Sequence, residues 1–180
     1  MLIQGGPIDI FGVGERLITS KSDPVFGAVY KIASIEKDGM WEPRIKISES
    51  VEKITNPGLK KVYRVYNDKG RAIADLLTLL REVPDTEEPY RYIDPEQPWR
   101  ELYFENCTFK EMKQLIIKDG KLVVDLPTLE EIRAYVQDQL ANEIWPEEQR
   151  FENPHRHYLD MSPSYYQLKM DLLNRIYRKK

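Results

Sequence analysis

The sequence predicts an α/β fold in which one parallel strand is followed by antiparallel hairpins and two carboxy-terminal helices. An apolar stretch near the amino terminus runs directly into a Gly-Val-Gly turn, and short β-rich segments with glycine-containing turns follow it. Near the carboxy terminus the apolar residues recur at helical spacing. A chain of 180 residues can hold one large domain or slightly more.

The first segment, residues 1–27, contains the stretch IDIFGVGERL at residues 8–17. Gly12 and Gly14 carry no side chains, so a phosphate can approach the backbone N–H groups there. Such a turn taken alone is more often only a tight connection. A parallel strand needs neighbours on both sides, and the few preceding residues cannot supply them. We therefore expect the last strand and phosphate turn of an incomplete α/β barrel, with the earlier strands on a preceding segment.

Residues 28–83 are predicted to form antiparallel hairpins. Turns are predicted at Lys37-Asp38-Gly39 and at Asn67-Asp68-Lys69-Gly70, where glycine suits a positive φ. Asn56-Pro57-Gly58 places Pro and Gly at the central positions of a type II turn. The strands that these turns separate are predicted over residues 28–36, 44–48, 60–66 and 71–79.

Residues 84–98 form a proline-rich connection with at most one strand, at 90–93. Residues 99–180 form a carboxy-terminal accessory region, with a strand over 102–109 and a turn at 118–121. Its two helices are predicted near 129–145 and 163–178 from the capping-box spacing of Thr128 and Glu131 and from the pair Ser162-Pro163. The first helix has an apolar stripe that should pack against another element, formed by Leu129, Ile132, Val136, Leu140 and Ile144.

The composition argues against several classes of protein. Charged residues make up 32% of the chain, are interspersed and sum to −3, which is typical of a solvated globular surface and not of a nucleic-acid binder. The single cysteine, Cys107, allows no internal disulfide, and we interpret it as a buried thiol. We recognise no signal peptide and no membrane-spanning run, so we expect a cytoplasmic protein without membrane contact.

Asp9 and the two histidines have competing interpretations. Asp9 could orient a ribose or a metal-bound water, or it could cap the turn by bonding to its backbone, and we favour the cap. His155 and His157 invite a metal or general-base role, but no third ligand has a suitable spacing. We therefore predict that the histidines bond to backbone in a loop, and we predict no metal site.

Eight blocks of residues, in order over nearly the whole chain, form a longer pattern. They are Gly5–Gly14, Leu17–Thr19, Val29–Lys31, Lys46–Ser48, Lys53–Lys60, Tyr63-Arg64, Asp125–Arg133 and Arg150–His155. This pattern resembles the carboxy-terminal part of nicotinate phosphoribosyltransferase, of the type II phosphoribosyltransferase family.

The resemblance implies site residues. Gly12 and Gly14 would hold the 5′-phosphate shared by phosphoribosyl pyrophosphate and the mononucleotide product, close to Asp9. Glu15 would share the loop and offer only its backbone N–H, because a carboxylate repels phosphate. Four matched basic residues could build a basic wall beside the site or form the solvent face of strands, and both interpretations stay open: Lys46, Lys53, Lys60 and Arg64.

The resemblance also implies a reaction. Nicotinate joins phosphoribosyl pyrophosphate with loss of pyrophosphate, coupled to ATP hydrolysis through a phosphorylated histidine, and nicotinate mononucleotide for NAD salvage results. Mg²⁺ and ATP are the implied cofactors, and a homodimer is the implied assembly. The base-binding aromatic and the phosphorylated histidine lie outside this chain, so we predict no catalytic residue in it. The alternative is a non-catalytic fragment, or a dimerisation or binding module, that needs a partner carrying the rest of the barrel.

Overall fold

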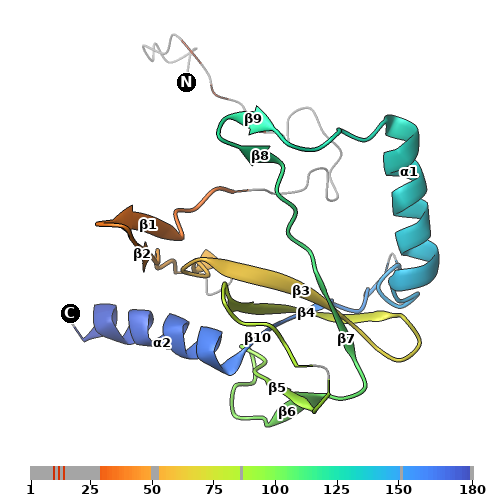
Figure 1. The fold of residues 1–180 in the computed structure, drawn as a ribbon. Helices are drawn as coiled ribbons and strands as arrows, with labels where there is room; N and C mark the ends of the chain where they lie inside the picture. Colours follow the sequence, from red (N-terminus) through yellow and green to blue (C-terminus); the bar gives the residue numbers. More distant parts are fainter. Residues whose placement is uncertain are drawn as a thin grey trace, which may run out of the picture. The chain divides into compact units, whose positions relative to one another are not determined.

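The structure, a computed structural model, describes residues 29–49, 53–85, 87–150 and 152–178, together with Ile10, Gly12 and Gly14. The chain separates into two compact units, residues 1–31 and 32–180. All helices and strands given below belong to the second unit (Figure 1). Apart from Ile10, the parallel strand predicted before the phosphate turn lies outside the described residues. The incomplete barrel therefore stays a prediction.

A four-stranded mixed sheet forms the centre of the second unit, in the order β10-β4-β3-β7. Its strands are β3 (Lys60–Tyr66), β4 (Ala72–Leu79), β7 (Thr108–Glu111) and β10 (Tyr158–Met161). Antiparallel pairing joins β3 to β4 and to β7, whereas β10 runs parallel to β4 at the edge. The β3–β4 hairpin confirms the sequence prediction, and Gly70 has a φ of 75° in its turn. β10 was not predicted from the sequence.

Each face of this sheet is covered by a different element. On one face Tyr63 and Val65 of β3 lie opposite Leu76 and Ala74 of β4, and Phe104 packs over them. On the other face the core cluster consists of Leu77, Met161 and Tyr165. Since side chains alternate between faces along a strand, β3 and β4 contribute to both cores at once.

Three smaller two-stranded sheets occur among the described residues. They pair β1 (Ser34–Lys37) with β2 (Met40–Pro43), β5 (Tyr90–Tyr92) with β6 (Leu102–Phe104), and β8 (Ile117–Lys118) with β9 (Lys121–Leu122). The strand predicted at 90–93 and the turn predicted at 118–121 are confirmed.

Three of the strand predictions need correction. The strand predicted over 28–36 is shorter, because residues 29–33 are not in a strand and β1 begins at Ser34. The strand predicted at 44–48 is wrong: Asp38 and Gly39, with φ of 52° and 76°, form a two-residue turn, so Met40 pairs at once with Lys37 and the second strand is 40–43. The strand predicted at 102–109 is two strands in different sheets. Asn106 has a φ of 52° between them, a conformation that asparagine tolerates and that ends β6.

The first helix, α1 (Leu129–Asp138), begins at the predicted capping box and continues as a π-helical turn, η4 (Gln139–Glu143). The Thr128 N–H donates to Oε2 of Glu131 at 2.7 Å, which confirms the predicted start. The prediction that its apolar stripe packs against another element is wrong for the described residues, because no residue of α1 is buried and Leu129 is 75% exposed. Its carboxy-terminal part is joined to the β3–β4 hairpin. The Tyr66 hydroxyl donates to Oε2 of Glu143 in η4, and the indole N–H of Trp145, just after η4, donates to the Ala72 carbonyl at 2.7 Å.

The second helix, α2 (Pro163–Tyr177), starts at Ser162 as predicted, and the Ser162 hydroxyl accepts a hydrogen bond from the Tyr165 N–H at 3.1 Å. Tyr165 is fully buried, and its hydroxyl donates to the Pro57 carbonyl at 2.9 Å. Gly58, with a φ of 79°, completes the predicted turn there. Neither α1 nor α2 has the length and apolar character needed to cross a bilayer, within the part of the chain that the structure describes.

We predict that Tyr165→Phe destabilises the protein by about 1–3 kcal/mol, because it leaves the buried Pro57 carbonyl without its donor. Urea unfolding monitored by circular dichroism measures the effect. Tyr177→Phe, at a tyrosine that is 56% exposed near the end of the same helix, is the matched control and should change stability by less than about 0.5 kcal/mol. Equal stabilities for the two variants would contradict the assigned role of the hydroxyl.

Candidate functional site

The predicted phosphate turn is described only at its two glycines. Gly12 and Gly14 are exposed, and a Cβ added to either would meet no atom within 4 Å. Asp9 and Glu15 lie outside the described residues. No described residue therefore requires glycine at these positions on steric grounds, and phosphate binding by the turn stays a prediction.

The four basic residues have different surroundings. Lys60 and Arg64 lie on the same face of β3, but both already have acceptors. The Lys60 ammonium donates to the Asn56 carbonyl at 2.9 Å and to the Gly58 carbonyl at 3.2 Å, and burial lowers the pKa of its amine. Lys46 and Lys53 are exposed, and both lie within the connection between β2 and β3. The structure does not test whether any of them contacts a phosphate.

Arg64 belongs to a row of alternating charges. Its Nε and Nη2 donate to the two carboxylate oxygens of Asp75 at 2.9 and 3.2 Å. His157 continues the row, with Nε2 3.5 Å from Oδ1 of Asp75 and Nδ1 3.2 Å from Oε1 of Glu148. The row joins β3, β4, the segment that follows η4 and the start of β10.

The two histidines differ in what they contact. Asp75 raises the pKa of His157, burial opposes this, and Glu148 adds to the rise. Among the described residues, His157 therefore hydrogen-bonds to the Glu148 carboxylate through Nδ1 and faces Asp75 with Nε2, and its ring does not bond to the backbone as the sequence predicted. His155 is exposed, and its ring lies edge-on to Tyr158 at 5.4 Å. Among the residues that the structure describes, no group of three or more His, Cys, Asp or Glu residues could hold a metal ion.

We predict that His157→Gln destabilises the protein by about 1 kcal/mol at pH 5.5 and by less at higher pH. A pKa that folding raises stabilises the native state fully below the unfolded pKa of about 6.5, and this contribution is lost as the pH rises through the folded value. Urea unfolding at several pH values, with the exposed His155→Gln as control, measures the difference. A difference that grows with pH would contradict the assigned charge on His157.

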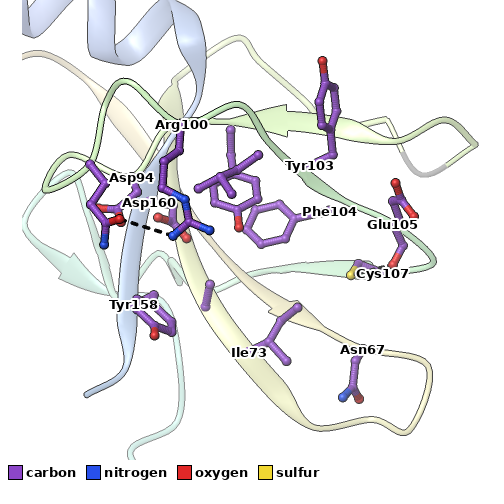
Figure 2. A pocket seen from close by; sticks show the side chains of 14 residues that line it. Asn67, Ile73, Asp94, Arg100, Tyr103, Phe104, Glu105, Cys107, Tyr158 and Asp160 are labelled. Atoms are coloured by element: carbon purple, nitrogen blue, oxygen red, sulfur yellow. Dashed lines mark hydrogen bonds between the residues drawn. The ribbon is translucent and has the colours of Figure 1, made fainter. Parts of the chain in front are cut away.

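A pocket of about 530 Å³ lies between the β5–β6 hairpin and the edge strand β10 (Figure 2). Tyr158 and Asp160 of β10 pair in register with Ala74 and Leu76, so they point to the face that the hairpin covers. The other main contributors to its lining are Ile73, Tyr92, Asp94, Arg100, Phe104 and Cys107. Cys107 is half-buried there, less than the buried thiol predicted from the sequence.

Asp160 is the most unusual residue of this pocket. Asp160 is only 4% exposed. Burial and the nearby Asp94 carboxylate together raise the pKa of its carboxyl group to about 7. His157 acts in the opposite direction. Sequence reasoning missed Asp160. Its one available signal was an acidic residue between apolar ones, Leu159 and Met161, just before the helix cap at Ser162.

We predict that the contribution of Asp160 to the stability of the native chain falls as the pH rises from about 4 to 7. Folding raises this pKa, so the unfolded state loses its proton first, and the native state is penalised by up to about 1.4 kcal/mol per pH unit. Asp160→Asn should remove this slope, whereas Asp119→Asn in the exposed β8–β9 turn should keep it. Parallel stability curves for Asp160→Asn and the unmodified chain would contradict the buried ionisation.

Comparison with known proteins relates this chain to nicotinate phosphoribosyltransferases. A family model described as the nicotinate phosphoribosyltransferase C-terminal domain matches residues 59–169. The sequence is 35% identical over 174 residues to a nicotinate phosphoribosyltransferase of Bacillus subtilis (strain 168), covering 96% of this chain and 35% of the relative. It is 34% identical over 164 residues to one of Caenorhabditis elegans, covering 89% of this chain and 28% of the relative.

A solved structure agrees with these sequence matches. The crystal structure of human nicotinic acid phosphoribosyltransferase superposes on 65% of this chain and 23% of its own, with a TM-score of 0.60 and 25% identity. The chain spans about a third of the length of the Bacillus subtilis relative and a smaller share of the Caenorhabditis elegans relative. The matches confirm the resemblance recognised from the sequence.

Proposed function

Since the chain belongs to the nicotinate phosphoribosyltransferase family, by its C-terminal domain, we propose that it is the carboxy-terminal portion of such an enzyme. In this proposal it supplies the phosphate-binding end of the site through Gly12 and Gly14, together with the accessory region that follows. The observation that carries the proposal is one match running over 96% of the chain to a relative nearly three times as long.

The proposed reaction is the transfer of a phosphoribosyl group from phosphoribosyl pyrophosphate to nicotinate, coupled to ATP hydrolysis, for NAD salvage. Mg²⁺ would enter with the pyrophosphate, whose oxygens suit this cation. ATP has no site assigned to residues of this chain. A cytoplasmic homodimer, without nucleic acid, is part of the same proposal.

A second candidate function is that of a non-catalytic binding or dimerisation module. The exposed apolar stripe of α1 favours it, because an amphipathic helix normally buries such a stripe against another element. Four members of the stripe are exposed, namely Leu129, Ile132, Val136 and Leu140, and the neighbouring Tyr135 is exposed beside them. A partner that carries the remainder of the barrel would cover it.

Co-expression with the amino-terminal two thirds of the Bacillus subtilis relative tests both candidates. We expect the chain alone to form no nicotinate mononucleotide from nicotinate, phosphoribosyl pyrophosphate and ATP, and the combination to form it. Gly12→Val should reduce turnover by the combination at least about tenfold, because its side chain blocks the approach of the phosphate. Gly39→Asn, at a turn where asparagine accepts a positive φ, is the control and should leave turnover unchanged.

The outcomes separate the proposals. Turnover by the chain alone would refute the fragment interpretation. Co-purification without turnover would support the module and contradict the enzyme portion. If the two segments neither associate nor form nicotinate mononucleotide, both proposals are contradicted.

A further inference from the structure

The pocket between the β5–β6 hairpin and β10 contains a carboxylate that has no partner among the described residues, on a residue that is itself buried. Asp160 is 4% exposed and lines the pocket, yet none of the hydrogen bonds or ion pairs among the described residues involves its side chain. Burying a carboxylate is costly unless a donor or cation compensates it. Asp94, the nearest acidic neighbour, increases the cost, and its Oδ1 already accepts from the Glu96 N–H at 2.8 Å. A cation or a strong donor that enters the pocket would compensate the charge of the ionised carboxylate.

The walls of the pocket favour an organic cation over a metal ion. Asp94 and Asp160 provide two carboxylates, which are fewer than a metal site needs. The described residues contain no cluster of three or more His, Cys, Asp or Glu side chains that could hold a metal ion. Tyr92 stacks on Phe104 with ring centroids 3.9 Å apart, and Ile73 and Tyr158 also line the pocket. These side chains suit the carbon body of a small molecule, and aromatic faces attract ammonium groups.

Arg100 supplies the opposite charge at the rim of the pocket. Its side chain is exposed and lines the same pocket as Asp160 (Figure 2), and the ion pairs of the described residues do not include Arg100 with Asp160. Among the described residues its one side-chain bond is from Nη1 to Oε1 of Gln97, at 3.3 Å. A guanidinium with unused donors binds carboxylates in a planar, paired geometry. The carboxylates of Asp94 and Asp160 and the guanidinium of Arg100 thus line one pocket without pairing with each other.

We propose that this pocket binds a small zwitterion, its ammonium group held by Asp160 and Asp94 and its anionic group by Arg100. The carbon chain between the two charges lies against Tyr92 and Phe104. ω-Amino acids have this chemistry. The site belongs wholly to the second unit and does not depend on the proposed phosphoribosyl transfer. A negative result for the zwitterion site therefore does not contradict the proposed transfer, and the reverse also holds.

Titration of the isotope-labelled full chain, followed by nuclear magnetic resonance, tests the site. The probes are 4-aminobutanoate and 6-aminohexanoate, with 1,6-diaminohexane and hexanoate lacking one of the two charges. We expect amide shifts in residues 92–107 and 158–160 with at least one amino acid, weaker binding of the diamine, and none of hexanoate. Charge-assisted hydrogen bonds make each lost contact worth about tenfold in affinity.

Variants assign the two ends. Asp160→Asn should weaken binding of the amino acid and of the diamine about tenfold, while Arg100→Gln should weaken binding of the amino acid only. Asp119→Asn should bind like the unmodified chain, and the spectra show whether each variant is folded. No shift at millimolar amino acid, hexanoate binding equal to that of the amino acids, or unchanged affinity in folded Asp160→Asn would each overturn the proposal.

Discussion

The antiparallel pairing of β3 with β4 is the constraint on which the rest of the described structure depends. These two strands form both cores, since Val65 and Leu76 are fully buried on one face and Leu77 is buried on the other. Every other strand of the central sheet pairs with one of them, and α2 packs on β4. A slip of one residue in their register would exchange the two faces and remove the support of each covering element.

The edge strand β10 carries the chemically unusual residues because it runs parallel to β4 at the end of the sheet. Alternation along it sends Asp160 into the pocket under the β5–β6 hairpin and Met161 into the opposite core. His157, just before the strand, joins the charged row with Asp75 and Glu148. This short strand and the residue before it thus place a buried carboxylate and a half-buried imidazole where their ionisation depends on the fold.

Features set by neighbouring residues were predictable from the sequence, and features set by distant contacts were not. The capping box at Thr128 and Glu131 and the glycine turn at Gly70 were found because their chemistry is local. β10 was missed because only its pairing with β4, some eighty residues earlier, makes it a strand. For the same reason Asp160 could not be recognised as buried, nor could the unpaired state of the α1 stripe. Phosphate binding at Gly12 and Gly14 depends on a ligand, and the family resemblance alone pointed to it.

The most direct test of the account is a crystal structure of the chain assembled with a complementary barrel segment and nicotinate mononucleotide. The account predicts that the backbone N–H groups at Gly12 and Gly14 lie within hydrogen-bonding distance of the 5′-phosphate oxygens, about 2.7–3.2 Å. A 5′-phosphate bound entirely by other residues, with both glycines away from it, would contradict the assignment of this turn as the phosphate-binding end of the site.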